Sequence, residues 1–192
     1  MYEKADVITQ RLVRVLYREF LRLLINIDEL NLVSSTNKVY ETLTSSMIEG
    51  FIELAVYMKP DIKEDEIIDW LNKPSLVTFY SFLGELDRQK QRLQEALEVN
   101  RSKIILDKYM RQGAWLVGEF MVELTDYLNI TTLKEKGVTE VIWRTEDDEK
   151  VCDVCRMLDG TIFPIDEIVP KPHPNCRCYY EEYTRTEKSI IA

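Results

Sequence analysis

The sulfur and imidazole side chains of this chain are confined to one short segment near its end. The four cysteines and the only histidine lie between residues 152 and 178, and neither type occurs before residue 152. Four of the six prolines lie in the same segment. Such a concentration of rare residues indicates a site. Its candidate metal ligands are Cys152, Cys155, His173, Cys176 and Cys178.

The spacing of these residues is typical of a zinc site. Two thiolates that are two residues apart, as in Cys152 and Cys155, bind one tetrahedral zinc ion because the turn between them directs both sulfurs inward. His173 and Cys176 repeat this spacing with an imidazole in first place. A zinc ion with four protein ligands is structural, and a module of roughly 50 residues is too small for a large apolar core. We therefore predict structural zinc, with no catalytic and no other cofactor-binding residues.

Five candidate ligands compete for four positions, and the sequence leaves the spare one open. In an extended segment Cys176 and Cys178 would point to the same side, so both could bind the metal and leave His173 outside. Alternatively, His173 and Cys176 form the second pair of ligands while Cys178 packs in the core. The second arrangement, with Cys152 and Cys155 completing the set, is slightly favoured.

Other uses of clustered cysteines fit the pattern less well. The first residues lack the apolar core of a secretory signal, and the sequence has no apolar run of about 18 residues that could cross a membrane. In a reducing cytoplasm, clustered thiols are metal ligands more often than disulfides. The alternatives are a cluster that stays reduced or disulfide-bonded, a Cys-x-x-Cys redox site and a His–Cys nucleophilic pair.

The region before the cluster has the apolar periodicity of helices. Helices are predicted for residues 5–30, 36–58, 61–71, 76–98 and 102–128, with Pro60 and Pro74 as boundaries. Gly113 and Gly118 disfavour an unbroken last helix, because each costs about 1 kcal/mol relative to alanine in a helix interior.

Residues that favour β-structure follow Asn129. Residues 138–145 predict a strand, and residues 161–163 and 179–183 predict two more. We therefore predict an α+β fold. A mostly helical body over residues 1–135 precedes a small zinc-stapled, β-rich module over residues 136–185 and a tail over residues 186–192.

The net charge of −9 limits the partners of the chain, because a negative protein is repelled by phosphate. The segment after residue 140 also carries more acidic than basic side chains. One basic stretch remains, formed by Arg11, Arg14, Arg18 and Arg22 in the first predicted helix. This arginine ladder is either a solvated face or a contact face for an acidic partner or nucleic acid.

Two stretches around the cysteines carry a family resemblance. The stretch from Val141 to Phe163 contains Val-Ile-Trp-Arg-Thr, an acidic run, Val-Cys-Asp-Val-Cys and Leu-Asp-Gly, and it is followed by His-Pro-Asn-Cys-Arg-Cys from His173 to Cys178. This combination resembles the C-terminal module of the phage Mu protein F-like minor head proteins, a group that overlaps the tailed-phage head morphogenesis family. The match covers about residues 138–180.

The resemblance implies a structural protein of the virion head that acts in head morphogenesis and is no enzyme. Its implied partners are the portal protein, the major capsid protein at the capsid interior, and packaged DNA as a further partner, but no membrane. It would be assembled in the host cytoplasm, in an oligomeric state that the head assembly sets.

The family pattern also suggests roles for single residues. Trp143 would pack over the metal module, and Asp159 and Gly160 would form a tight turn with glycine at positive φ. Arg177 would either bond to Asp147 or Asp159 or be exposed.

The alternative functions are a DNA-binding protein and a zinc-supported, nuclease-like protein involved in genome packaging or ejection. A nuclease of that kind needs a general-base histidine and usually further ligands for a second metal. The one histidine here has the spacing of a metal ligand. DNA binding would depend on the arginine ladder alone.

Overall fold

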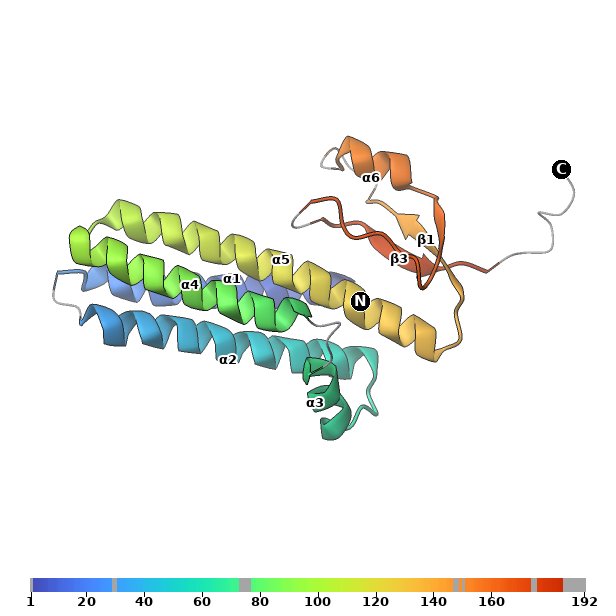
Figure 1. The fold of residues 1–192 in the computed structure, drawn as a ribbon, viewed down its shortest axis with the longest axis horizontal. Coiled ribbons are helices and arrows are strands. Elements are labelled where there is room, and N and C mark those ends of the chain that lie inside the picture. The colour runs from blue at the N-terminus through green and yellow to red at the C-terminus, as the bar shows by residue number, and fades with distance from the viewer. Residues whose placement is uncertain are drawn as a thin grey trace, which may run out of the picture. The chain divides into compact units, whose positions relative to one another are not determined.

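The computed structural model describes residues 2–28, 31–72, 77–146, 149, 151–173 and 176–184. The chain divides into two compact units, Met1–Glu123 and Leu124–Ala192, and one long helix contributes residues to both (Figure 1). No helix among the described residues is long and apolar enough to cross a membrane. The predicted boundary at Pro74 and the predicted tail over residues 186–192 lie outside the described residues.

The first unit consists of helices, of which the long ones lie side by side while a short one is set across them (Figure 1). They are α1 (Tyr2–Ile25), α2 (Leu32–Met58), α3 (Glu64–Asn72), α4 (Val77–Val99) and the first part of α5 (Lys103–Glu135). The predicted apolar stripe of α1 is its buried face, with Ile8, Leu12, Leu16, Phe20 and Leu23 all at most 3% exposed. The helical body expected from the periodicity is therefore confirmed.

Several helix bounds differ from those expected. α1 ends at Ile25, and α2 begins at Leu32 because the Asn31 side chain accepts a hydrogen bond from the Ser34 N–H at 3.1 Å and caps the helix. The predicted start of α3 at Asp61 is wrong, since that helix begins at Glu64.

α5 is unbroken and continues past Asn129 to Glu135. Its end follows a Schellman motif, in which the Val138 N–H donates to the Leu133 carbonyl and the Gly137 N–H to the Lys134 carbonyl. Gly137 has a φ of +80°, which only glycine adopts without strain. The transition from helix to β-structure, which we placed after Asn129, therefore occurs at Gly137.

Two helix-interior glycines let α1 pack closely against its neighbours. A Cβ added at Gly50 of α2 would lie 2.9 Å from Ile8 Cγ2, and one at Gly113 of α5 would lie 3.1 Å from Leu16 Cδ2. Gly113 thus allows close helix packing without interrupting α5, and this packing offsets its low helix propensity.

The second unit contains a small antiparallel sheet, formed by β1 (Glu140–Arg144), β2 (Ile162–Pro164) and β3 (Tyr179–Glu182) in the order β2-β1-β3. The short helix α6 (Asp153–Leu158) lies between β1 and β2 in sequence. In the central strand Trp143 pairs with Tyr180 and is completely buried. The α+β fold is therefore confirmed, and the core around Trp143 includes three of the cysteines, Cys155, Cys176 and Cys178.

Candidate metal centre

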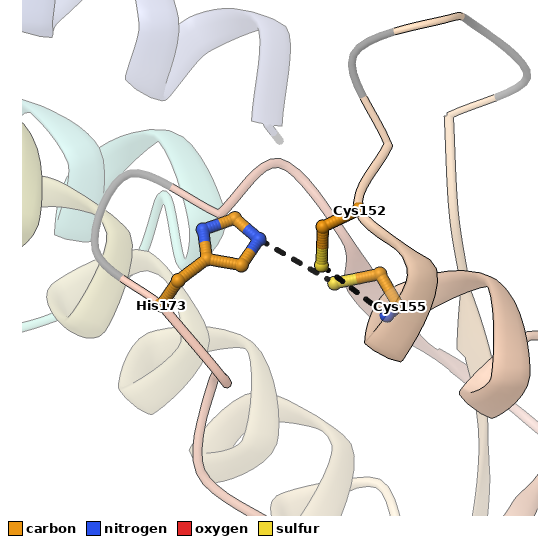
Figure 2. A group of neighbouring side chains, drawn as sticks. All are labelled: Cys152, Cys155 and His173. Atoms are coloured by element: carbon orange, nitrogen blue, oxygen red, sulfur yellow. Dashed lines mark hydrogen bonds between the residues drawn. The ribbon is translucent and has the colours of Figure 1, made fainter.

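The start of α6 brings the first two cysteines together. Cys152 is the N-cap residue, with extended backbone, and its Sγ accepts a hydrogen bond from the Cys155 N–H at 3.4 Å. This geometry turns both sulfurs to the same side of the first helical turn (Figure 2). The Cys-x-x-Cys spacing therefore acts as the sequence predicts, by directing two thiols to one point.

The other two cysteines precede β3 and lie close to Cys155. Cys176 and Cys178 are 2% and 4% exposed, and the Cys176 Sγ lies 3.5 Å from the Cys155 Sγ. The sulfurs of Cys155, Cys176 and Cys178 lie within 4.8 Å of one another. The two later cysteines therefore share one side of their segment.

His173 reaches the cluster from the loop before Cys176. Its Nε2 lies 3.7 Å from the Cys155 Sγ, and its ring points toward the two sulfurs of the α6 turn (Figure 2). The ligand atoms of Cys152, Cys155 and His173 also lie within 4.8 Å of one another. Cys155 thus belongs to two overlapping groups of three, which together contain all five predicted ligands.

The two ligand-to-ligand distances at Cys155 suit a tetrahedral zinc ion. Zn–S bonds of about 2.3 Å place two sulfurs about 3.8 Å apart, and a nitrogen at about 2.05 Å lies about 3.6 Å from a sulfur. The observed 3.5 Å between Cys155 and Cys176 and 3.7 Å between Cys155 and His173 are close to these values. The Cys/His cluster could therefore hold a metal ion, and the choice of spare ligand stays open.

Burial disfavours the thiolate form of two of the four cysteines. Burial, followed by hydrogen bonds among the neighbouring thiols, raises the pKa of Cys155 far above its ordinary value. Burial raises the pKa of Cys178 to about 11. The Cys155 N–H, by contrast, lowers the pKa of Cys152. A divalent cation would stabilise the thiolates that burial alone disfavours.

A lysine that the sequence analysis missed lies beside the cluster. The side chain of Lys171 is 8% exposed, and its Nζ lies 3.3 Å from the Asp126 Oδ2 and 4.7 Å from the centre of the Trp143 ring. It also donates a hydrogen bond to the Cys178 carbonyl. Lys171 thus ties the cysteine segment to the last part of α5. A lone lysine between two prolines gave no pattern that could predict this.

The turn after α6 has the predicted form. Gly160 has a φ of +77°, and the Asp159 carboxylate accepts a hydrogen bond from the Thr145 N–H at 2.9 Å. The side chain of Arg177 is exposed, while Asp147 lies outside the described residues.

Most arginines of the ladder form ion pairs within the first unit. Arg11 lies 2.6 Å from a Glu53 oxygen, while Arg22 and Arg18 lie 2.7 and 3.1 Å from Glu19. Glu19 is only 4% exposed. Three of the four arginines thus have carboxylate partners, which the α1 sequence pattern did not reveal.

Comparison with known proteins supports one relationship. No curated protein and no solved structure matches the chain. Residues 118–181, which contain all five candidate ligands, match the family model described as Phage Mu protein F like protein. This match confirms that the C-terminal part of the chain resembles the Phage Mu protein F-like family.

Proposed function

We propose that this protein is a minor head protein of a phage or prophage, that it acts in head morphogenesis, and that it carries a structural zinc ion. One observation carries the proposal. The five candidate ligands converge around Cys155 inside the segment that matches the Phage Mu protein F-like family.

In this proposal the zinc ion is a structural element of the second unit. Cys152 and Cys155 belong to α6, Cys178 directly precedes β3, and His173 and Cys176 lie in the connecting loop. A metal held by four of these side chains joins segments that share only a small core. Closed zinc sites of this kind supply folding free energy rather than an open catalytic position.

We further propose that the protein is not an enzyme. The chain has one histidine, and its Nε2 lies against the Cys155 sulfur. If this imidazole is one of the four zinc ligands, it cannot also serve as a general base. The pairing of the arginine ladder with Glu19 and Glu53 speaks against DNA as its main partner.

The proposed location is the virion head, assembled in the host cytoplasm, with the portal protein or the inner capsid surface as partner. The support is the family resemblance of residues 118–181. The oligomeric state would follow from the symmetry of the head structure to which the protein binds.

The test combines metal analysis with purification of assembled heads. We expect about one zinc ion per chain by mass spectrometry, and co-purification of the protein with heads. Cys155→Ser should abolish zinc binding, whereas Val154→Ser, on an exposed neighbour in α6, should not. Metal-free wild-type protein would refute the zinc site, and absence from purified heads would refute the head function.

A further inference from the structure

A groove between α4 and α5 lies entirely within the first unit. Its volume is about 770 Å³, and its apolar lining comes from Phe82, Trp115, Leu116 and Phe120. The rings of Phe82 and Phe120 lie 4.7 Å apart and both are buried, whereas Trp115 is 47% exposed. The groove therefore combines a packed aromatic base with a large indole that is left partly in water, which is typical of a protein contact site.

The unbalanced charge in this groove is negative. Glu119 and Glu123 lie one turn apart on α5, both line the groove, and neither has an ion-pair partner among the described residues. Burial and the charge of Glu123 raise the pKa of Glu119, as expected for a carboxylate beside a like charge. Glu119 and Glu123 are therefore placed to pair with a basic side chain of a partner.

The basic residues of the groove are already paired. Arg111 lies 3.0 Å from the Asp107 carboxylate, and Arg92 lies 3.8 Å from Glu85. Glu85 also pairs with Arg88 at 2.7 Å, and neither Arg92 nor Arg111 forms an ion pair with Glu119 or Glu123 among the described residues.

A buried amide adds a third unused acceptor. Gln89 lines the groove and is 6% exposed, and its Oε1 has no hydrogen-bond donor within the part of the chain that the structure describes. Buried polar atoms are nearly always paired in a finished structure. The unpaired acceptor of Gln89 and the carboxylates of Glu119 and Glu123 thus belong to the lining of one groove.

We propose that this groove binds an amphipathic segment of a partner protein. The segment places apolar side chains against Trp115 and Phe82 and a lysine or arginine between Glu119 and Glu123. The inference rests on the proposed function in one respect, namely that the partner is the portal or the major capsid protein. A nucleic acid does not fit, because its phosphates would meet the two carboxylates.

The first test is site-specific photo-crosslinking from the groove. The full-length protein carries p-benzoylphenylalanine in place of Trp115 during head assembly, and the products are identified by mass spectrometry. We expect a crosslink to the portal or capsid protein. The same group in place of Ile104, which is 81% exposed on α5 and does not line the groove, is the matched control and should give none.

The second test isolates the charges. Purified portal and capsid proteins are titrated with the wild-type chain and with the double variant Glu119→Gln/Glu123→Gln. We expect about tenfold weaker binding and a weaker salt dependence for the variant. Glu41→Gln/Glu49→Gln changes the net charge equally at exposed sites on α2 and should bind like the wild type. Equal thermal unfolding of the variants excludes a folding defect.

The outcomes separate this inference from the proposed function. If the wild type binds a head protein but position 115 gives no crosslink and the double variant binds equally well, the groove proposal is overturned while the head function stands. A crosslink to this chain itself also overturns it. If the wild type binds neither head protein and position 115 crosslinks to a protein outside the head, both the head function and the assigned partner are refuted.

Discussion

The two units of this protein are stabilised by different means. The first buries long apolar stripes between helices, with residues such as Leu12, Phe51 and Leu93 completely enclosed. The second has a three-stranded sheet of short strands and a core in which three of the buried side chains are cysteines. Apolar burial grows with the length of the packed elements, so a small unit needs another source of stability. In the second unit, cysteines therefore occupy core positions that longer elements fill with apolar side chains in the first.

The largest effect is expected from removing the proposed zinc ion. We expect a strong chelator, or Cys155→Ala, to unfold residues 140–182 while the helices of the first unit stay folded. Structural zinc contributes about 10 kcal/mol or more of apparent binding free energy in small domains, and this free energy stabilises the fold. Hydrogen exchange resolved along the chain measures which residues unfold. Retained protection in β1 and β3 after chelation would contradict a metal-dependent unit.

A cavity made in the core of the first unit should destabilise that unit without affecting the metal site. Leu12 is completely buried in α1, so Leu12→Ala should lower the free energy of unfolding of that unit by about 2–5 kcal/mol. The metal content should not change. Chemical denaturation followed by helical circular dichroism, with zinc analysis of the same samples, gives both values. Val7→Ala, at a 58% exposed position of the same helix, serves as control.

The Lys171 interaction is expected to stabilise the second unit independently of the metal. Lys171→Met keeps most of the volume but leaves Asp126, which is 15% exposed, without its cation. Loss of one partner of a largely buried pair costs about 3 kcal/mol. We expect faster hydrogen exchange in β3 with zinc still bound. Simultaneous loss of zinc would show that Lys171 acts through the metal site instead.

Close helix packing can be tested with glycines. Gly50→Ala should destabilise the first unit by about 1–3 kcal/mol, because the new Cβ would lie 2.9 Å from Ile8 Cγ2. Gly84→Ala, in α4, meets only the end of the Arg88 side chain at 3.5 Å and should stabilise it by about 0.5–1 kcal/mol. Thermal unfolding distinguishes the two variants. A stability change of the same sign in both would contradict the role of Gly50 in close helix packing.

The smallest expected effect is a dependence on pH in the first unit. The hydrogen bond from Lys4, aided by Arg11, holds the pKa of Glu53 below its ordinary value of 4.5. A lowered carboxyl pKa contributes stability above the unfolded value, and that contribution is lost as the pH falls through the folded value. We expect Glu53→Gln to remove less than about 1 kcal/mol at pH 7 and to flatten the acid limb of the stability profile. An unchanged profile would show that the pair adds nothing.

The sequence predicts those features of this protein that depend on local spacing. The apolar stripe of α1, the strand around Val141–Trp143 and the five converging ligands all follow from periodicities or short motifs. Bounds that depend on capping were less accurate, as at Asn31 and at the end of α5.

Partners that are distant in sequence could not be predicted. Asp126 meets Lys171, and Glu53 meets Lys4 and Arg11, although nothing local links the members of each group. The groove beside Trp115 also depends on the packing of α4 against α5, which periodicity does not specify. Such contacts are set by tertiary structure, and a single sequence contains no spacing rule for them.

The shared place of Cys155 in both ligand groups has a consequence for how this module tolerates mutation. Each outer donor belongs to only one of the two groups of three, so a chain that loses Cys178 or His173 keeps the other group intact. A chain that loses Cys155 loses the donor that lies at 3.5 Å from Cys176 and at 3.7 Å from His173. Among related chains, we therefore expect substitutions at the outer donors to be more frequent than substitutions at Cys155.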